Sequence, residues 1–127
     1  MPQTSPWGPV QSCDTLCPGV FLVTTASHGG TMVASEAAAI LSPAAKKCGF
    51  KDKGYLCFEE DCDAQVALRE LMDKKMIQAP VNERFGPGAY EAVINSSVQI
   101  HHPEYWQARE KAISEQNRQA KKKGRER

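Results

Sequence analysis

His28 is the side chain best suited to acid–base chemistry in this sequence. It follows the apolar segment 19–26 and precedes Gly29 and Gly30, which places it where a strand should end in a turn. An imidazole titrates near neutral pH and can act as a general base or a metal ligand. The structural alternative, which we favour, is that the ring holds the turn through a hydrogen bond to a loop carbonyl.

A second set of reactive side chains lies further along the chain. Four carboxylates fall within five residues: Glu59, Glu60, Asp61 and Asp63. Together with His28, and with Cys62 between them, they could bind a divalent metal or support acid–base hydrolysis. The simpler explanation is that acidic residues suit the positive end of a helix. A nucleophilic Cys62 would also need a histidine neighbour, and only folding can bring His28 or His102 close.

The five cysteines are predicted to be free thiols: Cys13, Cys17, Cys48, Cys57 and Cys62. Their number is odd and cytosolic proteins are kept reduced, so we expect no disulfide framework. Their Cys-x3-Cys and Cys-x4-Cys spacings differ from the paired Cys-x2-Cys knuckles of a zinc ribbon. The cysteine pattern therefore predicts neither a structural zinc ion nor another cofactor.

The N-terminal half of the chain predicts strands separated by helices. Four prolines within residues 1–18 indicate an extended arm or an edge strand, because proline lacks the backbone donor. β-branched and aromatic residues over 19–26 predict a strand, and 54–58 predicts a second strand that pairs with it. Alanine-rich sequence over 35–41 and 42–49 predicts two short helices or one broken helix.

The C-terminal half is predicted to be helical. Apolar residues recur on one face from 63 to 75, which indicates an amphipathic helix. Proline and glycine in 76–88 predict a loop, and 89–98 predicts another helix. A last helix should begin near Pro103. Beyond Ile113 almost no apolar residue remains to hold that helix against a core.

These elements predict an α+β fold in which a small antiparallel sheet packs against several helices. The length of 127 residues suits one domain. We expect an extended proline-rich arm at 1–18, a globular α+β domain at 19–113 and a mobile, basic helical tail at 114–127.

The charge of the chain is divided unevenly along its length. Residues 109–127 hold eight Lys or Arg against three Glu, whereas residues 1–108 hold eight against twelve acidic residues. A basic tail can contact nucleic-acid phosphates, and the candidate residues are Lys121, Lys122, Lys123, Arg125 and Arg127. The chain has no apolar run of eighteen residues and no secretory leader pattern at its start, so we expect a cytoplasmic protein without a membrane span.

Three separated segments resemble an uncharacterised bacterial domain family that is carried on plasmids and prophages. They are Trp-Gly-Pro-Val-Gln at 7–11, Thr-Ala-Ser-His-Gly-Gly at 25–30 and Glu-Glu-Asp-Cys-Asp at 59–63. A later segment, His-His-Pro-Glu-Tyr-Trp at 101–106, is similar to the pattern that closes that family's domain. The resemblance spans residues 7 to 106 and implies a mobile-element setting rather than a reaction.

The functional prediction is a small non-enzymatic interaction protein of a phage or plasmid, which binds a host or element-encoded protein. Inhibition of a host defence system, such as a CRISPR effector or a restriction enzyme, is its most specific form. Binding would use aromatic anchors, with these candidates: Trp7, Phe85, Tyr90, Tyr105 and Trp106. The alternatives are a hydrolase centred on His28 and a nucleic-acid-binding protein that uses the basic tail.

Overall fold

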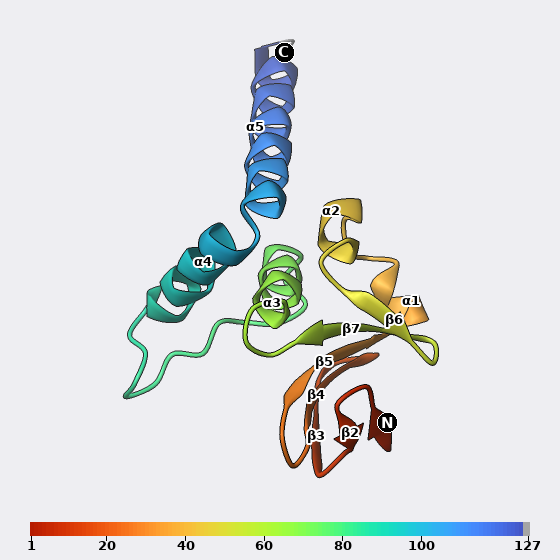
Figure 1. Ribbon diagram of the computed structural model, residues 1–127. Coiled ribbons are helices and arrows are strands. Elements are labelled where there is room, and N and C mark those ends of the chain that lie inside the picture. Colours follow the sequence, from red (N-terminus) through yellow and green to blue (C-terminus); the bar gives the residue numbers. More distant parts are fainter. Residues whose placement is uncertain (126–127) are drawn as a thin grey trace.

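Five strands form one antiparallel sheet, and helices cover one of its faces (Figure 1). The computed structural model describes residues 1–125. In spatial order the strands are β3 (Ser12–Cys17), β4 (Val20–Thr24), β5 (Gly29–Ala34), β7 (Tyr55–Glu59) and β6 (Phe50–Asp52). A separate small hairpin consists of β1 (Thr4–Ser5) and β2 (Gly8–Pro9). The predicted α+β fold with a small antiparallel sheet is confirmed.

Five helices complete the domain: α1 (Ser35–Ala38), α2 (Pro43–Lys46), α3 (Ala64–Asp73), α4 (Ala89–His101) and α5 (Pro103–Arg125). The two short helices predicted in 35–49, the helix predicted after 63 and the loop at 76–88 are all present. Ser42 caps α2 through a hydrogen bond that its Oγ accepts from the Ala45 amide at 3.1 Å. In the described part of the chain, no helix is both long enough and apolar enough to cross a bilayer.

The main hydrophobic core lies between the sheet and the helices. Side chains of one sheet face, among them Val20, Val33 and Phe58, pack against α3, α4 and the start of α5. Phe58 is fully buried, and α3 contributes Val66 and Leu71 to the same cluster. Because a strand turns alternate residues to opposite faces, the neighbouring residues of these strands form a second cluster on the other side.

Trp7 covers this second cluster. Its ring packs with buried Val23, Met32 and Cys57, and it makes an edge contact with the ring of Phe50 at a centroid distance of 6.2 Å. The N-terminal segment is therefore fixed to the sheet by one large aromatic side chain, whose broad apolar surface suits this role.

Residues 12–17 form β3, which pairs with β4 at one edge of the sheet, so the second alternative predicted for 1–18, an edge strand, is present. Two other predictions about the N-terminal half need correction. The strand at 20–24 does not pair with the strand at 55–59, because β5 lies between them. No strand was predicted at 29–34, since Gly29 and Gly30 weaken strand propensity and resemble a turn. They nevertheless lie in the central strand.

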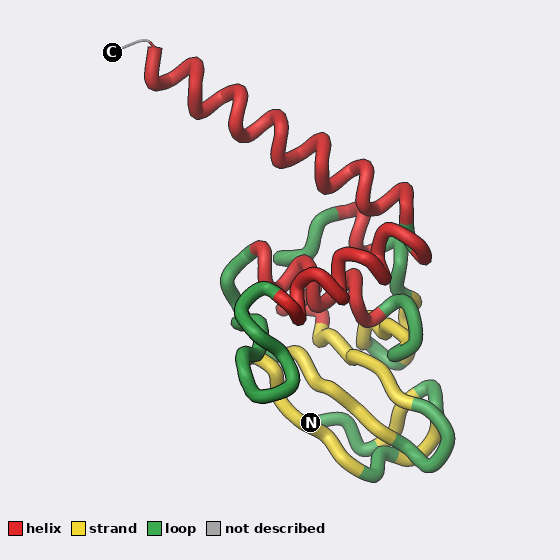
Figure 2. The backbone as a smooth tube through the Cα atoms, turned by 90° about the vertical axis from the view of Figure 1, so that its left-hand side faces the viewer, coloured by secondary structure: helices red, strands yellow, loops and turns green. Residues whose placement is uncertain are grey.

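The C-terminal helix is continuous. α5 runs from Pro103 through Arg125 without a break at Ile113, where the prediction divided globular domain from tail. At 1.5 Å per residue, its 23 residues span about 34 Å. Figures 1 and 2 show its C-terminal part standing away from the body of the protein. Arg127 lies outside the described residues.

All five cysteines are free thiols, and the pKa of two of them is strongly raised. Burial is the main cause that raises the pKa of Cys48 and of Cys57 to about 11 in each case. Because the thiolate is the nucleophile, each should react with iodoacetamide at pH 8 about 100-fold more slowly than in the urea-unfolded chain. Peptide mass spectrometry measures the two rates. Equal rates in the folded and the unfolded chain would contradict the burial of these thiols.

Candidate functional site

His28 lies in the exposed turn between β4 and β5. The turn is held by its backbone and by Thr25, whose amide donates to the His28 carbonyl at 2.8 Å and whose Oγ1 accepts from the His28 amide at 3.1 Å. Thr25, rather than the imidazole, therefore performs the turn-holding role expected of the His28 ring. The ring has no hydrogen bond to any residue within the described range.

The acidic residues that were grouped with His28 lie at the end of β7. The Glu60 amide donates to the Gly29 carbonyl at 3.1 Å, so this end of β7 lies beside the His28 turn. Glu60 and Asp61 are exposed, and Glu59 is half-buried. Water therefore surrounds most of these carboxylates, and within residues 1–125 His28 does not join them in a cluster of potential metal ligands.

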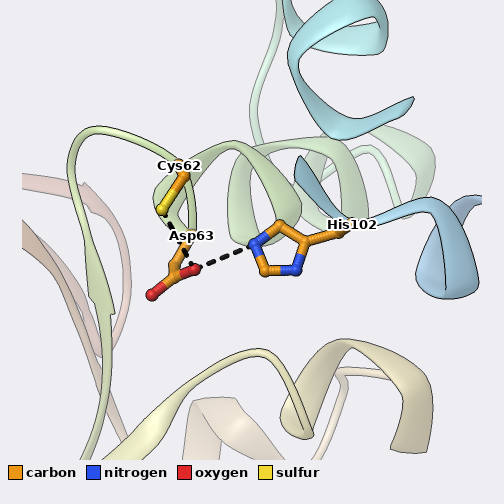
Figure 3. Close-up of side chains that lie close together, drawn as sticks. All are labelled: Cys62, Asp63 and His102. Atoms are coloured by element: carbon orange, nitrogen blue, oxygen red, sulfur yellow. Dashed lines mark hydrogen bonds and ion pairs between the residues drawn. The ribbon is translucent and has the colours of Figure 1, made fainter. Parts of the chain in front are cut away.

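Folding instead brings two members of the predicted set, Cys62 and Asp63, together with His102 (Figure 3). His102 Nε2 lies 2.8 Å from Asp63 Oδ1, and the Cys62 thiol donates to the same oxygen at 3.4 Å. Asp63 makes no capping hydrogen bond to α3, although helix capping was the expected role of the acidic segment. Its carboxylate is directed to His102, at the bend between α4 and α5.

The surroundings of the Cys62 thiol disfavour its thiolate form. Burial raises its pKa, and so do the hydrogen bond to Asp63 and the negative charges of Asp63 and Glu59. No cationic partner within hydrogen-bonding distance offsets these effects among the described residues. Cys62 alone is therefore a poor nucleophile, as its acidic neighbours predicted.

The start of α5 is fixed to the body by Tyr105. This side chain is only 3% exposed, and its hydroxyl donates to Glu70 Oε2 at 2.7 Å. The other oxygen of Glu70 accepts a hydrogen bond from the Ser42 amide at 2.7 Å, so one buried carboxylate joins α3, α5 and the start of α2. Burial, assisted by this hydrogen bond, raises the pKa of the Tyr105 phenol far above its usual range.

One turn further along α5, Arg109 makes a second attachment. Its guanidinium donates two hydrogen bonds to the Asp73 carboxylate, at 2.7 and 2.9 Å. The bond to Asp73 raises the pKa of Arg109, and the guanidinium also lies 4.8 Å from the centre of the Trp106 ring. These contacts hold the first turns of α5 in a fixed direction.

The aromatic residues proposed as partner anchors are mostly engaged within the protein. Tyr105 is buried, which corrects its assignment as an exposed anchor, and Trp7 packs on the sheet. Trp106 is half-buried beneath Arg109. Phe85 and Tyr90 contact each other edge to face at 5.3 Å, and both remain partly accessible. Aromatic content alone could not separate core residues from surface anchors.

Two of the large apolar side chains that face solvent lie together on α4. Val93 is 59% exposed and Ile100 is 73% exposed, while Ile94 and Val98 on the opposite side of the helix are buried. We call Ala92, Val93, Ser96, Gln99 and Ile100 the α4 outer face; all five are exposed. Sequence analysis missed this face, although the spacing of seven residues between Val93 and Ile100 placed them on one side of the helix.

The nucleic-acid candidates lie at the end of α5. Lys121 is exposed, and the backbone of Lys122, Lys123 and Arg125 continues the helix. Closer to the body, Arg118 pairs with Glu115 at 2.7 Å. Lysine and arginine outnumber glutamate over residues 109–125 by seven to two, so the projecting helix carries a net positive charge.

The fold and these surfaces define a small α+β domain with an antiparallel sheet on one side and a projecting basic helix on the other. The chain belongs to the family described as a domain of unknown function (DUF7007), which matches it over residues 1–127. No curated protein and no solved structure shows detectable similarity to it.

Proposed function

We propose that this protein is a non-enzymatic interaction protein that binds an acidic protein partner through the α4 outer face and the projecting part of α5. The observation that carries the proposal is that two exposed surfaces lie on consecutive helices. The α4 outer face carries exposed apolar side chains, and the projecting part of α5 is basic. Ile100 lies in the last turn of α4, directly before the joint that leads into α5.

The α4 outer face supplies the apolar contacts. Val93 and Ile100 are about 10.5 Å apart along the helix axis and differ by only about 20° in direction. Burial of each side chain against a partner would contribute about 1.5–3 kcal/mol. Two such side chains on one helix fit a hydrophobic groove, as amphipathic helices do in many complexes.

Helix α5 supplies the charge. A helix that is polar on all sides and projects from its domain gains little from tertiary packing, so its sequence suits contact with another molecule. Positive charge along it attracts an acidic surface and accelerates association, an effect that salt screens. The α4 outer face favours a protein over nucleic acid as the partner, because its exposed valine and isoleucine gain from burial in an apolar groove.

The partner in this proposal is a host or element-encoded protein. The resemblance to domains of plasmids and prophages favours a component of a host defence system, such as a CRISPR effector or a restriction enzyme. The proposal of a host-defence partner rests on that resemblance. The proposal of an acidic protein partner rests on the α4 outer face and the basic part of α5.

Affinity purification from the bacterial host tests the proposal. A tagged chain with Val93→Gln and Ile100→Gln should recover at least about tenfold less of its specific partner than the original chain, because two apolar contacts are lost. The control Thr15→Gln introduces the same side chain at an exposed position of β3, far from α4, and should leave recovery unchanged.

Two results would contradict this assignment. Equal recovery by the double variant and the control would exclude the α4 outer face as the binding surface. Recovery of nucleic acid alone, lost at moderate salt and after deletion of residues 121–127, would replace the protein partner with nucleic acid. The helix that continues through Arg125 favours that second candidate, because residues 109–125 carry seven lysines and arginines against two glutamates.

A further inference from the structure

The side chains of Cys62, Asp63 and His102 offer three different types of metal ligand at one place. A thiol sulfur, a carboxylate oxygen and an imidazole nitrogen all lie within 4.8 Å of one another. Figure 3 shows all three side chains converging from the segment before α3 and from the α4–α5 joint. Residues separated by 39 positions in the sequence therefore meet here.

The separation of the thiol sulfur from the carboxylate oxygen fits a tetrahedral zinc ion. With bonds of about 2.0 Å to nitrogen or oxygen and 2.3 Å to sulfur, neighbouring ligand atoms in such a site are about 3.3–3.8 Å apart. The separation of Cys62 Sγ from Asp63 Oδ1 is 3.4 Å, within this range. The 2.8 Å between Asp63 Oδ1 and His102 Nε2 is shorter because a hydrogen atom joins them. Replacement of that hydrogen by the ion requires this pair to open by about half an ångström.

The ligand types select the metal. Thiolate and imidazole favour zinc and similar transition metals, whereas magnesium and calcium require several oxygen ligands. One carboxylate beside one sulfur and one nitrogen is a poor site for those hard ions.

The cluster is sheltered and still accessible. The side chains of His102 and Asp63 are 19% and 21% exposed, and Cys62 is half-buried. His102 also lines a groove of about 590 Å³, together with Cys48, Pro103, Tyr105 and others. Because the side chains of the cluster are themselves partly exposed, an ion can reach them from solvent, and water can complete its coordination.

We infer that Cys62, Asp63 and His102 form a binding site for a zinc ion, with water as the fourth ligand. On binding, Cys62 releases its proton to solvent and coordinates through the thiolate. The proton between Asp63 and His102 leaves Nε2, either for Nδ1 of the same ring or for solvent, so that Nε2 of the neutral ring can coordinate. The ion then joins the segment before α3 to the α4–α5 joint and adds a constraint on the start of α5. The site is independent of the α4 outer face, since none of its ligands belongs to that face.

Cobalt binding to the full, reduced, metal-free chain tests the site, because Co²⁺ takes tetrahedral zinc sites and its absorption spectrum reports sulfur ligation. We expect uptake of one ion per chain with a sulfur-to-cobalt charge-transfer band, and displacement of cobalt by zinc. Cys62→Ser should abolish the band and weaken zinc binding, measured by calorimetry, by at least about 100-fold. His102→Gln should weaken zinc binding similarly.

The control is Cys13→Ser, which removes a half-buried thiol on β3 and should leave the cobalt spectrum and the zinc affinity unchanged. Circular dichroism establishes that each variant is folded, and Cys62→Ser changes a single atom. Failure of the folded chain to bind cobalt or zinc would overturn the inference. A charge-transfer band of equal strength in Cys62→Ser would overturn it as well, since the sulfur would then come from another cysteine.

Discussion

Gly30→Ala should destabilise the protein by about 3 kcal/mol or more, because β5 leaves no space for a methyl group at this position. An added Cβ would lie 2.3 Å from the Phe58 carbonyl oxygen and 2.4 Å from a carbon of the Trp7 ring. The carbonyl belongs to the backbone of the paired strand β7, so it can move only if the sheet distorts. A loss of this size is a large part of the 5–15 kcal/mol that stabilises a typical domain.

Urea unfolding followed by circular dichroism measures this loss. The matched control is Gly86→Ala, where an added Cβ meets no atom within 4 Å, and its free energy of unfolding should change by less than about 0.5 kcal/mol. Trp7→Ala combined with Gly30→Ala removes the contact with the ring but not the contact with the carbonyl. The double variant should therefore stay unstable. Equal stability of the two glycine variants would show that β5 and β7 are not as close as the structure places them.

Tyr105→Ala should cost about 3–5 kcal/mol, the range for a large buried aromatic side chain. The substitution removes a ring that packs in the main core and leaves Glu70 Oε2 buried without the hydroxyl that donates to it. Tyr105→Phe keeps the ring and removes only the hydrogen bond, so its cost should be smaller, at about 1–3 kcal/mol.

The two Tyr105 variants also test whether Tyr105 attaches α5 to the body of the protein. In both variants, amide hydrogen exchange should become faster in the first turns of α5 and at the Ser42 amide, which donates to Glu70. The neighbouring exposed residue Gln107 provides the control, because Gln107→Ala should change neither the unfolding free energy nor the exchange rates. If Tyr105→Ala unfolded at the same urea concentration as this control, the buried contact would not hold α5.

The elements with strong local signals were predictable from the sequence. The run of β-branched and aromatic residues at 20–24 forms β4, and the amphipathic pattern after Asp63 forms α3. The central strand β5 was not predictable, because close packing and not strand propensity requires its glycines: Gly30 lies against Trp7 and Phe58, and Gly29 lies against the Val23 carbonyl. Without β5, the pairing partner of β7 could not be assigned correctly.

The same distinction applies to functional residues. His28 and the carboxylates attracted attention because they are near one another in sequence and chemically reactive. The pair of Asp63 and His102 depends on how α3 meets the α4–α5 joint, which no local pattern encodes. Likewise, the sequence shows where the large aromatic side chains are but not which of them are buried in the core and which remain on the surface.

The order of the strands makes the sheet simple to assemble. Three of its four strand pairings join strands that are consecutive in the chain, and the fourth, between β5 and β7, skips only β6. Even there, paired Ala34 and Tyr55 enclose a short stretch of chain. The contact order of the sheet is low, because paired strands are close in the sequence. Little entropy is therefore lost when the chain between them closes into a loop. The sheet can grow by hairpins from either half of the chain, and its folding is not limited by a search between distant segments.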